Sequence, residues 1–99
     1  MPAAQVREPQ DLHLWLKVNG RTRQDSNTRE MVFGVAELVR YLSHCMTLEP
    51  GDCITTGTPA GVGLGCNPPE YIKPGDVIEL GIDGFGSQRQ VATAWESKR

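Results

Sequence analysis

An alternating pattern near the start of the chain constrains its fold more than any other feature. Residues 12–18 place leucine or valine at every second position, with histidine, tryptophan and lysine between them. This period of two is typical of a β-strand with one buried face. Asn19-Gly20 follows directly, and Asn-Gly favours a two-residue hairpin turn because both positions accept positive φ. The sequence therefore predicts a hairpin with a second strand from about Arg21 to Asp25.

The next segment carries a helical pattern instead. Apolar residues recur there at i, i+3, i+4 and i+7, and the stripe continues by one further position: Val35, Leu38, Val39, Leu42 and Met46. We expect an amphipathic helix that ends near Thr47, ahead of Pro50. Gly34 is the expected N-cap, and Glu37 stands at the capping-box position three residues later.

The second half of the chain predicts short strands separated by tight turns. Eleven glycines and seven prolines indicate many turns. Strands are expected at residues 53–57, 77–82 and 87–95, with Pro-Gly-Asp turns at Pro50 and Pro74. The expected class is α+β, mainly β, in the order β-β-α-β-loop-β-β. One helix cannot cover such a sheet, so we expect its exposed face to need upstream chain or another subunit.

The length of 99 residues indicates one domain or part of one, with a thin core. Residues 1–10 are polar and carry two prolines, which is typical of a connecting arm. We expect the folded portion to span residues 11–95 and a short tail to span residues 96–99.

Charge and cysteine content exclude several classes of protein. The net charge is −2, and the sequence has no cluster of Lys and Arg of the kind that binds nucleic acid. Arg21, Arg23 and Arg29 alternate with acidic residues and indicate a solvated, charge-balanced face. No segment is apolar enough to cross a bilayer, and the N-terminus lacks a secretory signal. The three cysteines (Cys45, Cys53 and Cys66) fit no disulfide framework and favour free thiols in a reducing cytoplasm.

A glycine-rich loop at residues 57–65 is the strongest candidate for a binding site. It lacks the lysine of a phosphate-binding P-loop. The prolines that follow it also bar the helix that a dinucleotide fingerprint requires. Two interpretations stay open from the residues alone: a loop that only turns the chain, and a loop whose freed amides bind an anion, with the Thr58 hydroxyl beside them.

No metal centre is predicted from this chain. It contains no Glu-x-Glu, Asp-x-Asp or His-x-His pair, and its acidic residues are scattered. His13 and His44 are expected at the surface or an interface, because neither lies in a zinc-ligand pattern. Cys45 and Cys53 are interpreted as small hydrophobic residues of a helix and a strand. Cys66 lies in the loop, and nothing assigns it a catalytic base.

From about Asp11 to Gln90 the sequence resembles the fumarylacetoacetate hydrolase family. Five ordered blocks carry the resemblance: residues 18–20 (VNG), 24–33 (QDSNTREMVF), 48–52 (LEPGD), 56–63 (TGTPAGVG) and 73–76 (KPGD). The blocks are most similar to bacterial members of the homoprotocatechuate isomerase/decarboxylase and acylpyruvase types. Together they are far more specific than any one block.

The resemblance implies a mixed β-roll that dimerises, and a reaction on a small 2-oxo or 1,3-dioxo acid. It also implies a Mg²⁺ or Mn²⁺ ion, which stabilises an enolate during hydrolysis, decarboxylation or isomerisation. Thr58 matches the substrate-contacting threonine of the family, and Gly57 matches the surface beside the substrate carboxylate. Gln24 and Asn27 match positions for which we expect a structural role at the turn between hairpin and helix.

The chain departs from the family pattern in one important respect. The resemblance places the metal and catalytic centre, a Glu-x-Glu pair with a later Asp and a Lys, upstream of Met1. We therefore assign no catalytic residue and no metal ligand here, and expect the chain alone to be inactive. The alternative is a non-catalytic module that kept the fold for oligomerisation or for binding small acids.

Overall fold

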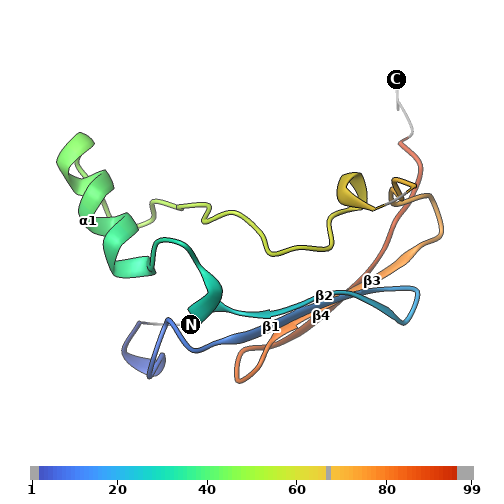
Figure 1. The fold of residues 1–99 in the computed structure, drawn as a ribbon, viewed down its shortest axis with the longest axis horizontal. Helices are drawn as coiled ribbons and strands as arrows, with labels where there is room; N and C mark the ends of the chain where they lie inside the picture. The colour runs from blue at the N-terminus through green and yellow to red at the C-terminus, as the bar shows by residue number, and fades with distance from the viewer. Residues whose placement is uncertain (1–2, 67, 96–99) are drawn as a thin grey trace.

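Four antiparallel strands form a single sheet in the order β2-β1-β3-β4 (Figure 1). The structure is a computed structural model that describes residues 3–66 and 68–95. The strands are β1 (His13–Val18), β2 (Arg21–Asn27), β3 (Val77–Ile82) and β4 (Gly86–Val91). With one α-helix beside this sheet, the predicted α+β, mainly β class is confirmed.

The first hairpin forms at the predicted turn. Asn19 has φ of 53° and Gly20 has φ of 77°, so both turn residues adopt the left-handed conformation that a tight two-residue hairpin requires. β2 continues to Asn27, two residues beyond the predicted end at Asp25. Leu12 supplies the reason, since its carbonyl accepts a hydrogen bond from the Thr28 amide beyond the end of the ladder.

The centre of the sheet joins two strands that are distant in sequence. The register pairs Leu14 with Ile82, Leu16 with Leu80 and Val18 with Ile78. Cross-strand partners point to the same side of a sheet, so the alternating residues of the two strands form one apolar face. β3 has the predicted bounds.

The last strand is shorter than the predicted 87–95. β4 ends at Val91, which pairs with Val77, the first residue of β3. Beyond that pair, Ala92 donates to the Asp76 carbonyl and accepts from the Gly75 amide in the preceding turn. The turn then directs the chain away from β4, and the Trp95 side chain is exposed. A tight turn precedes β4: Gly84 has positive φ, and the Phe85 amide donates to the Ile82 carbonyl.

Helix α1 spans Val35–Cys45 and begins after Gly34, as predicted. It ends two residues before the expected Thr47. The capping-box prediction is wrong, because the Glu37 carboxylate pairs with Arg40 (2.6 Å) along the helix surface. The first helical amide, that of Val35, instead donates to the side chain of Gln10 in the N-terminal arm.

The predicted strand at residues 53–57 is absent. This segment runs between α1 and the far end of the sheet as irregular chain, yellow-green in Figure 1. β-Branched residues favour extended backbone, but a strand also needs a neighbour for its backbone hydrogen bonds. Among the described residues the sheet contains four strands, and none of them pairs with residues 53–57. The observed order is therefore β-β-α-β-β.

None of the hydrophobic side chains in the described part of the chain is buried. The Cα radius of gyration is 16.4 Å, against about 13 Å for a compact domain of this length. Cys45 and Cys53 are free and exposed. Cys45 lies in the helix, as predicted, but Cys53 lies in irregular chain and not in a strand. Among the described residues, no helix is long and apolar enough to cross a membrane.

Candidate functional site

A cavity of about 350 Å³ lies where the end of β2, the turn before α1 and the irregular segment meet. The structure brings both predicted substrate-binding residues, Gly57 and Thr58, into its wall. The other lining residues are Leu14, Ser26, Asn27, Thr28, Glu30, Met31, Val32, Phe33, Leu38, Thr56 and Pro59. Residues up to 45 positions apart thus form one hollow beside the sheet.

Gln24 fixes the chemical role of the Thr58 hydroxyl. Its side-chain amide nitrogen lies 2.8 Å from Thr58 Oγ1 and 2.8 Å from the Pro59 carbonyl oxygen. The carbonyl can only accept, so the group facing both atoms must be the NH₂ donor. The Thr58 oxygen therefore accepts from Gln24, and its own O–H stays available to donate. A hydroxyl donor beside a cavity suits a ligand with a carboxylate or carbonyl oxygen.

Two glycines place the loop that carries Thr58. Gly57 has φ of +86°, a conformation that side chains with a Cβ rarely adopt. Gly61 has φ of +112°, and a Cβ there would lie 1.8 Å from the Arg23 carbonyl oxygen. The loop backbone therefore packs directly on β2, closer than any residue with a side chain allows.

An ion pair holds the far end of the loop on the same strand. The Arg23 guanidinium lies 2.7 Å from the Glu70 carboxylate and also donates to the Cys66 sulfur at 2.8 Å. Its side chain is only 14% exposed. The prediction that Arg23 lies on a solvated, charge-balanced face is therefore wrong, because the folded loop covers the Arg23 side chain. Arg21 and Arg29 remain exposed, beside Glu70 and Asp11 respectively.

Sequence reasoning missed these loop contacts. Arg23 and Glu70 stand 47 residues apart, and Gln24 and Thr58 stand 34 apart. The one available signal was Gln24 itself, which opens the family-like block at residues 24–33 directly after Arg23. We predicted a structural role for Gln24 at the turn between hairpin and helix. The structure shows instead that its side chain contacts the loop at Thr58 and Pro59.

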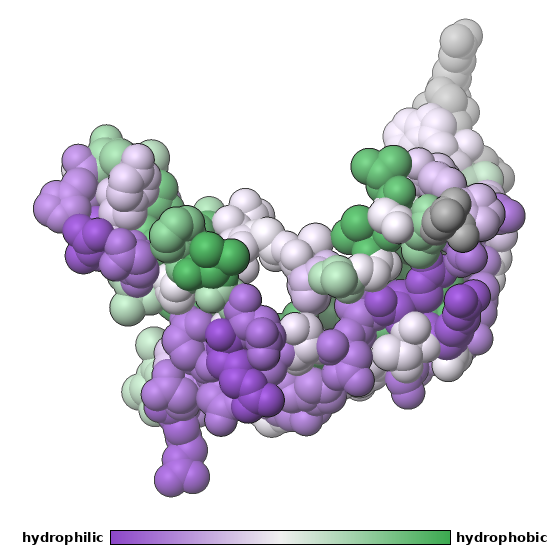
Figure 2. All heavy atoms as spheres, in the orientation of Figure 1, coloured by the Kyte–Doolittle hydropathy of each residue, from purple (hydrophilic) through white to green (hydrophobic). Residues whose placement is uncertain are grey.

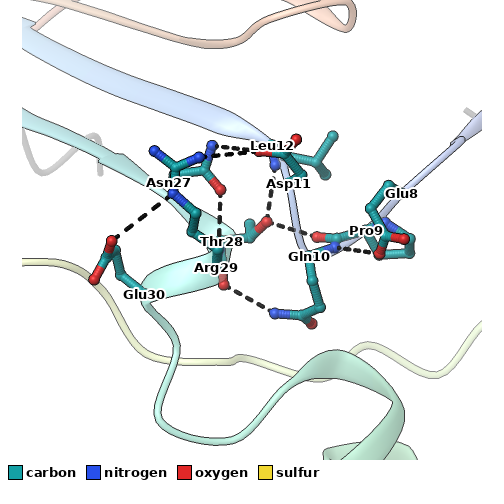
Figure 3. A network of polar contacts seen from close by, with 9 residues as sticks. All are labelled: Glu8, Pro9, Gln10, Asp11, Leu12, Asn27, Thr28, Arg29 and Glu30. Atoms are coloured by element: carbon teal, nitrogen blue, oxygen red, sulfur yellow. Dashed lines mark hydrogen bonds and ion pairs between the residues drawn. The ribbon is translucent and has the colours of Figure 1, made fainter.

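The predicted turn role does hold for Asn27, in the network of Figure 3. Asn27 caps the short 3-10 helix Thr28–Glu30 by accepting from the Arg29 amide, and its amide donates to Asp11. The Thr28 hydroxyl accepts from the Leu12 amide and donates to the Pro9 carbonyl. One wall of the cavity is thereby fixed to the N-terminal arm.

His13 lies on the sheet face opposite Leu14, away from the cavity wall. Its two ring nitrogens contact the carboxylates of Asp25 and Asp83. The hydrogen bond to Asp25, followed by that to Asp83, raises the pKa of the imidazole. This cluster ties β1 to β2 and to the turn after β3, so His13 is a structural residue in this arrangement.

The residues present do not fit a metal site. Across residues 3–66 and 68–95, no three His, Cys, Asp or Glu side chains come together in a way that could hold an ion. The cavity wall contributes a single carboxylate, that of Glu30. Its other polar side chains are hydroxyls and the Asn27 amide, which suit hydrogen bonding to an organic ligand.

Comparison with known proteins is consistent across sequence and structure. The family model described as fumarylacetoacetate (FAA) hydrolase C-terminal matches residues 1–92. A Burkholderia multivorans protein named "Putative hydrolase" is 57% identical over 91 residues, which are 91% of this chain and 32% of that protein. The chain thus spans about one third of the length of the relatives it matches.

Solved structures superpose closely on this fold. The structure of a Mycobacterium smegmatis protein described as a "putative HpcE protein" has a TM-score of 0.88 at 41% identity, covering 93% of this chain and 34% of that one. Maleylpyruvate hydrolase from Sphingobium sp. SYK-6, in complex with manganese(II) ion and pyruvate, has a TM-score of 0.83 at 36% identity, covering 94% and 33%.

Proposed function

The chain belongs to the fumarylacetoacetate hydrolase family, and we propose that it supplies the substrate-binding loop of a divalent-metal-dependent enzyme acting on 2-oxo or 1,3-dioxo acids. In this role Gly57 and Thr58 bind the carboxylate end of the substrate. The reaction is hydrolysis, decarboxylation or isomerisation next to the oxo group. Such steps share an enolate that a bound cation stabilises.

The single observation that carries this proposal is the donor state of Thr58. The Gln24 side chain donates a hydrogen bond to the Thr58 hydroxyl oxygen, so the hydroxyl proton is available to a ligand. Thr58 lines a cavity large enough for a small organic acid. A manganese- and pyruvate-bound structure of a 36% identical hydrolase supports a 2-oxo acid as the ligand.

The metal ligands of the proposed enzyme come from outside this chain, since the described residues offer no donor set for an ion. We therefore derive no step through the metal from these residues and propose that the chain alone does not turn over substrate. Its partner is the upstream part of the domain or a second subunit. The lack of buried hydrophobic side chains among the described residues supports such a partner.

The test is an NMR titration of the isotope-labelled chain with pyruvate, without metal. We expect shifts at the amides of Gly57 and Thr58, with saturation in the millimolar range. Thr58→Val keeps the shape but removes the hydroxyl, so pyruvate affinity should fall about tenfold. Thr58→Ser should retain most of it, and Thr22→Val, an exposed threonine outside the cavity, is the control.

Two results would overturn the proposal. One is a pyruvate titration that leaves the Gly57 and Thr58 amides unmoved, or that Thr58→Val does not weaken. The other comes from calorimetric titration with Mn²⁺ in the presence of oxalate, an enolate mimic. Tight, oxalate-enhanced binding would place a metal centre within this chain, contrary to the proposed division of the site.

A further inference from the structure

We propose that Arg23 is a positioning residue for the glycine-rich loop, and that a β-bulge in β2 gives it this role. Arg23 is not among the residues that line the cavity, yet it should set the affinity of Gly57 and Thr58 for a 2-oxo acid. It does so by holding the far end of the loop. This inference deepens the proposed function and rests on it.

The bulge lies in the pairing of β2 with β1. Leu16 pairs with Gln24, but the next residue of β1, Lys17, pairs with Thr22. Arg23 is therefore an extra residue that has no partner in β1. In a regular strand the side chains of Arg23 and Gln24 would point to opposite faces of the sheet. Because of the bulge, both side chains reach the loop.

These two neighbouring side chains hold opposite ends of the loop. Gln24 donates to Thr58 beside the cavity, whereas Arg23 donates to Cys66 (2.8 Å) and Glu70 (2.7 Å) at the far end. Neighbouring Cα atoms are about 3.8 Å apart, so one short stretch of β2 joins both ends. A loop that is fixed at both ends loses less conformational entropy when a ligand binds. Arg23 thereby pre-organises Thr58 without touching the ligand.

The backbone of the bulge provides a second contact. A Cβ added at Gly61 would collide with the Arg23 carbonyl oxygen, so the loop backbone packs directly on the bulged residue. Helix α1 does not support this end of the loop, since Figure 2 shows an open hollow above the sheet between α1 and the 3-10 turn Gly63–Gly65. Both the side chain and the backbone of Arg23 thus hold the loop on β2.

Three changes at this residue separate the guanidinium from the bulge. Arg23→Met keeps the extra residue, and pyruvate affinity in the NMR titration should fall about threefold. Deletion of Arg23 closes the bulge and leaves the ladder in register, because Thr22 and Gln24 already pair with consecutive residues of β1. Both contacts are then lost, and affinity should fall about tenfold. Arg23→Lys keeps a cation beside Glu70 and should recover about half of the loss in Arg23→Met.

Arg21→Met is the matched control, because Arg21 lies on the same strand beside the same Glu70 but is 75% exposed. Its pyruvate affinity should change by less than about twofold. Without ligand, the heteronuclear NOE of the loop amides should fall in Arg23→Met and in the deletion, but not in Arg21→Met. Strand amides should keep their hydrogen-exchange protection in all of them, which excludes general unfolding.

The outcomes distinguish this inference from the proposed function. If pyruvate shifts the Gly57 and Thr58 amides but Arg23→Met binds it as tightly as the unaltered chain, the positioning role is wrong and the proposed function stands. An unchanged loop NOE in Arg23→Met has the same meaning, and this variant decides the matter if the deletion does not fold. If pyruvate leaves both amides of the unaltered chain unmoved, both proposals are wrong.

Discussion

The sheet and the glycine-rich loop lie against each other, yet they are held in place by different means. Three antiparallel ladders of backbone hydrogen bonds join the four strands. The loop at residues 57–66 has no ladder and only a short 3-10 turn, Gly63–Gly65. It stays on β2 through the side chains of Arg23 and Gln24 and through the close approach at Gly61.

This difference determines where single substitutions act. A ladder spreads its stabilisation over many backbone groups that no side-chain change removes. The loop depends on two side chains and on the lack of a Cβ at one residue. The residues that position Thr58 can therefore be altered while the sheet stays intact, which separates binding from folding.

The largest effect is expected from Gly61→Ala. A methyl group there meets the Arg23 carbonyl at 1.8 Å, and φ is +112°, so the loop must leave β2. Gly75→Ala is the matched control, because Gly75 also has positive φ but open space around it. We expect destabilisation of about 3 kcal/mol at Gly61 against about 1 kcal/mol at Gly75. Urea unfolding measures both, and equal values would mean that the loop does not pack on β2.

Removing the partly buried Arg23 guanidinium should release the far end of the loop. In a background with Cys45 and Cys53 replaced by serine, Arg23→Met should raise the rate of Cys66 modification by a thiol reagent about tenfold, since Arg23 contacts its sulfur. Arg21→Met removes a 75% exposed arginine beside the same Glu70, and less than a twofold change is expected. Equal rates in the two variants would contradict a tether specific to Arg23.

Gln24 gives a smaller effect that is specific to the ligand. Gln24→Leu loses the hydrogen bonds to Thr58 and Pro59, and pyruvate affinity should fall about fivefold as the hydroxyl loses its orientation. Gln24→Glu should bind pyruvate more weakly still, because a carboxylate accepts the Thr58 proton and adds negative charge. Strand amides should keep their hydrogen-exchange protection in both variants. Equal or tighter binding by Gln24→Glu would contradict the donor role of Thr58.

The smallest effect is a pH dependence of the sheet. The carboxylates of Asp25 and Asp83 raise the pKa of His13 in the folded chain. When the pKa of a histidine is higher in the folded chain than in the unfolded chain, its protonation stabilises the fold. This stabilisation is complete below the unfolded pKa of about 6.5 and is lost as the pH rises through the folded pKa. Unfolding followed between pH 5 and 8 should therefore show falling stability, and His13→Gln should remove that slope. An unchanged slope in the variant would assign the dependence to another group.

Local sequence patterns predicted the elements whose determinants lie close together in the chain. The Asn19-Gly20 hairpin, the start of α1 and the bounds of β3 were correct for this reason. The strand at residues 53–57 was wrong because propensity cannot supply a pairing partner. Gly57 and Thr58, which line the cavity, were predicted as binding residues through family-like blocks. No local pattern reveals that a glutamine 34 positions earlier donates to the Thr58 hydroxyl.

The contact between Gln10 and the start of α1 has a consequence for the order of folding. An 11-residue helix is marginal in isolation, because forming the first turn is the unfavourable step. Here the side chain of Gln10 accepts from the Val35 amide and donates to the Thr28 carbonyl. The group that assists nucleation is therefore positioned by the hairpin, and it leaves the ribosome 25 residues before the helix begins. During synthesis the folded hairpin can thus hold the Gln10 side chain at the point where α1 begins.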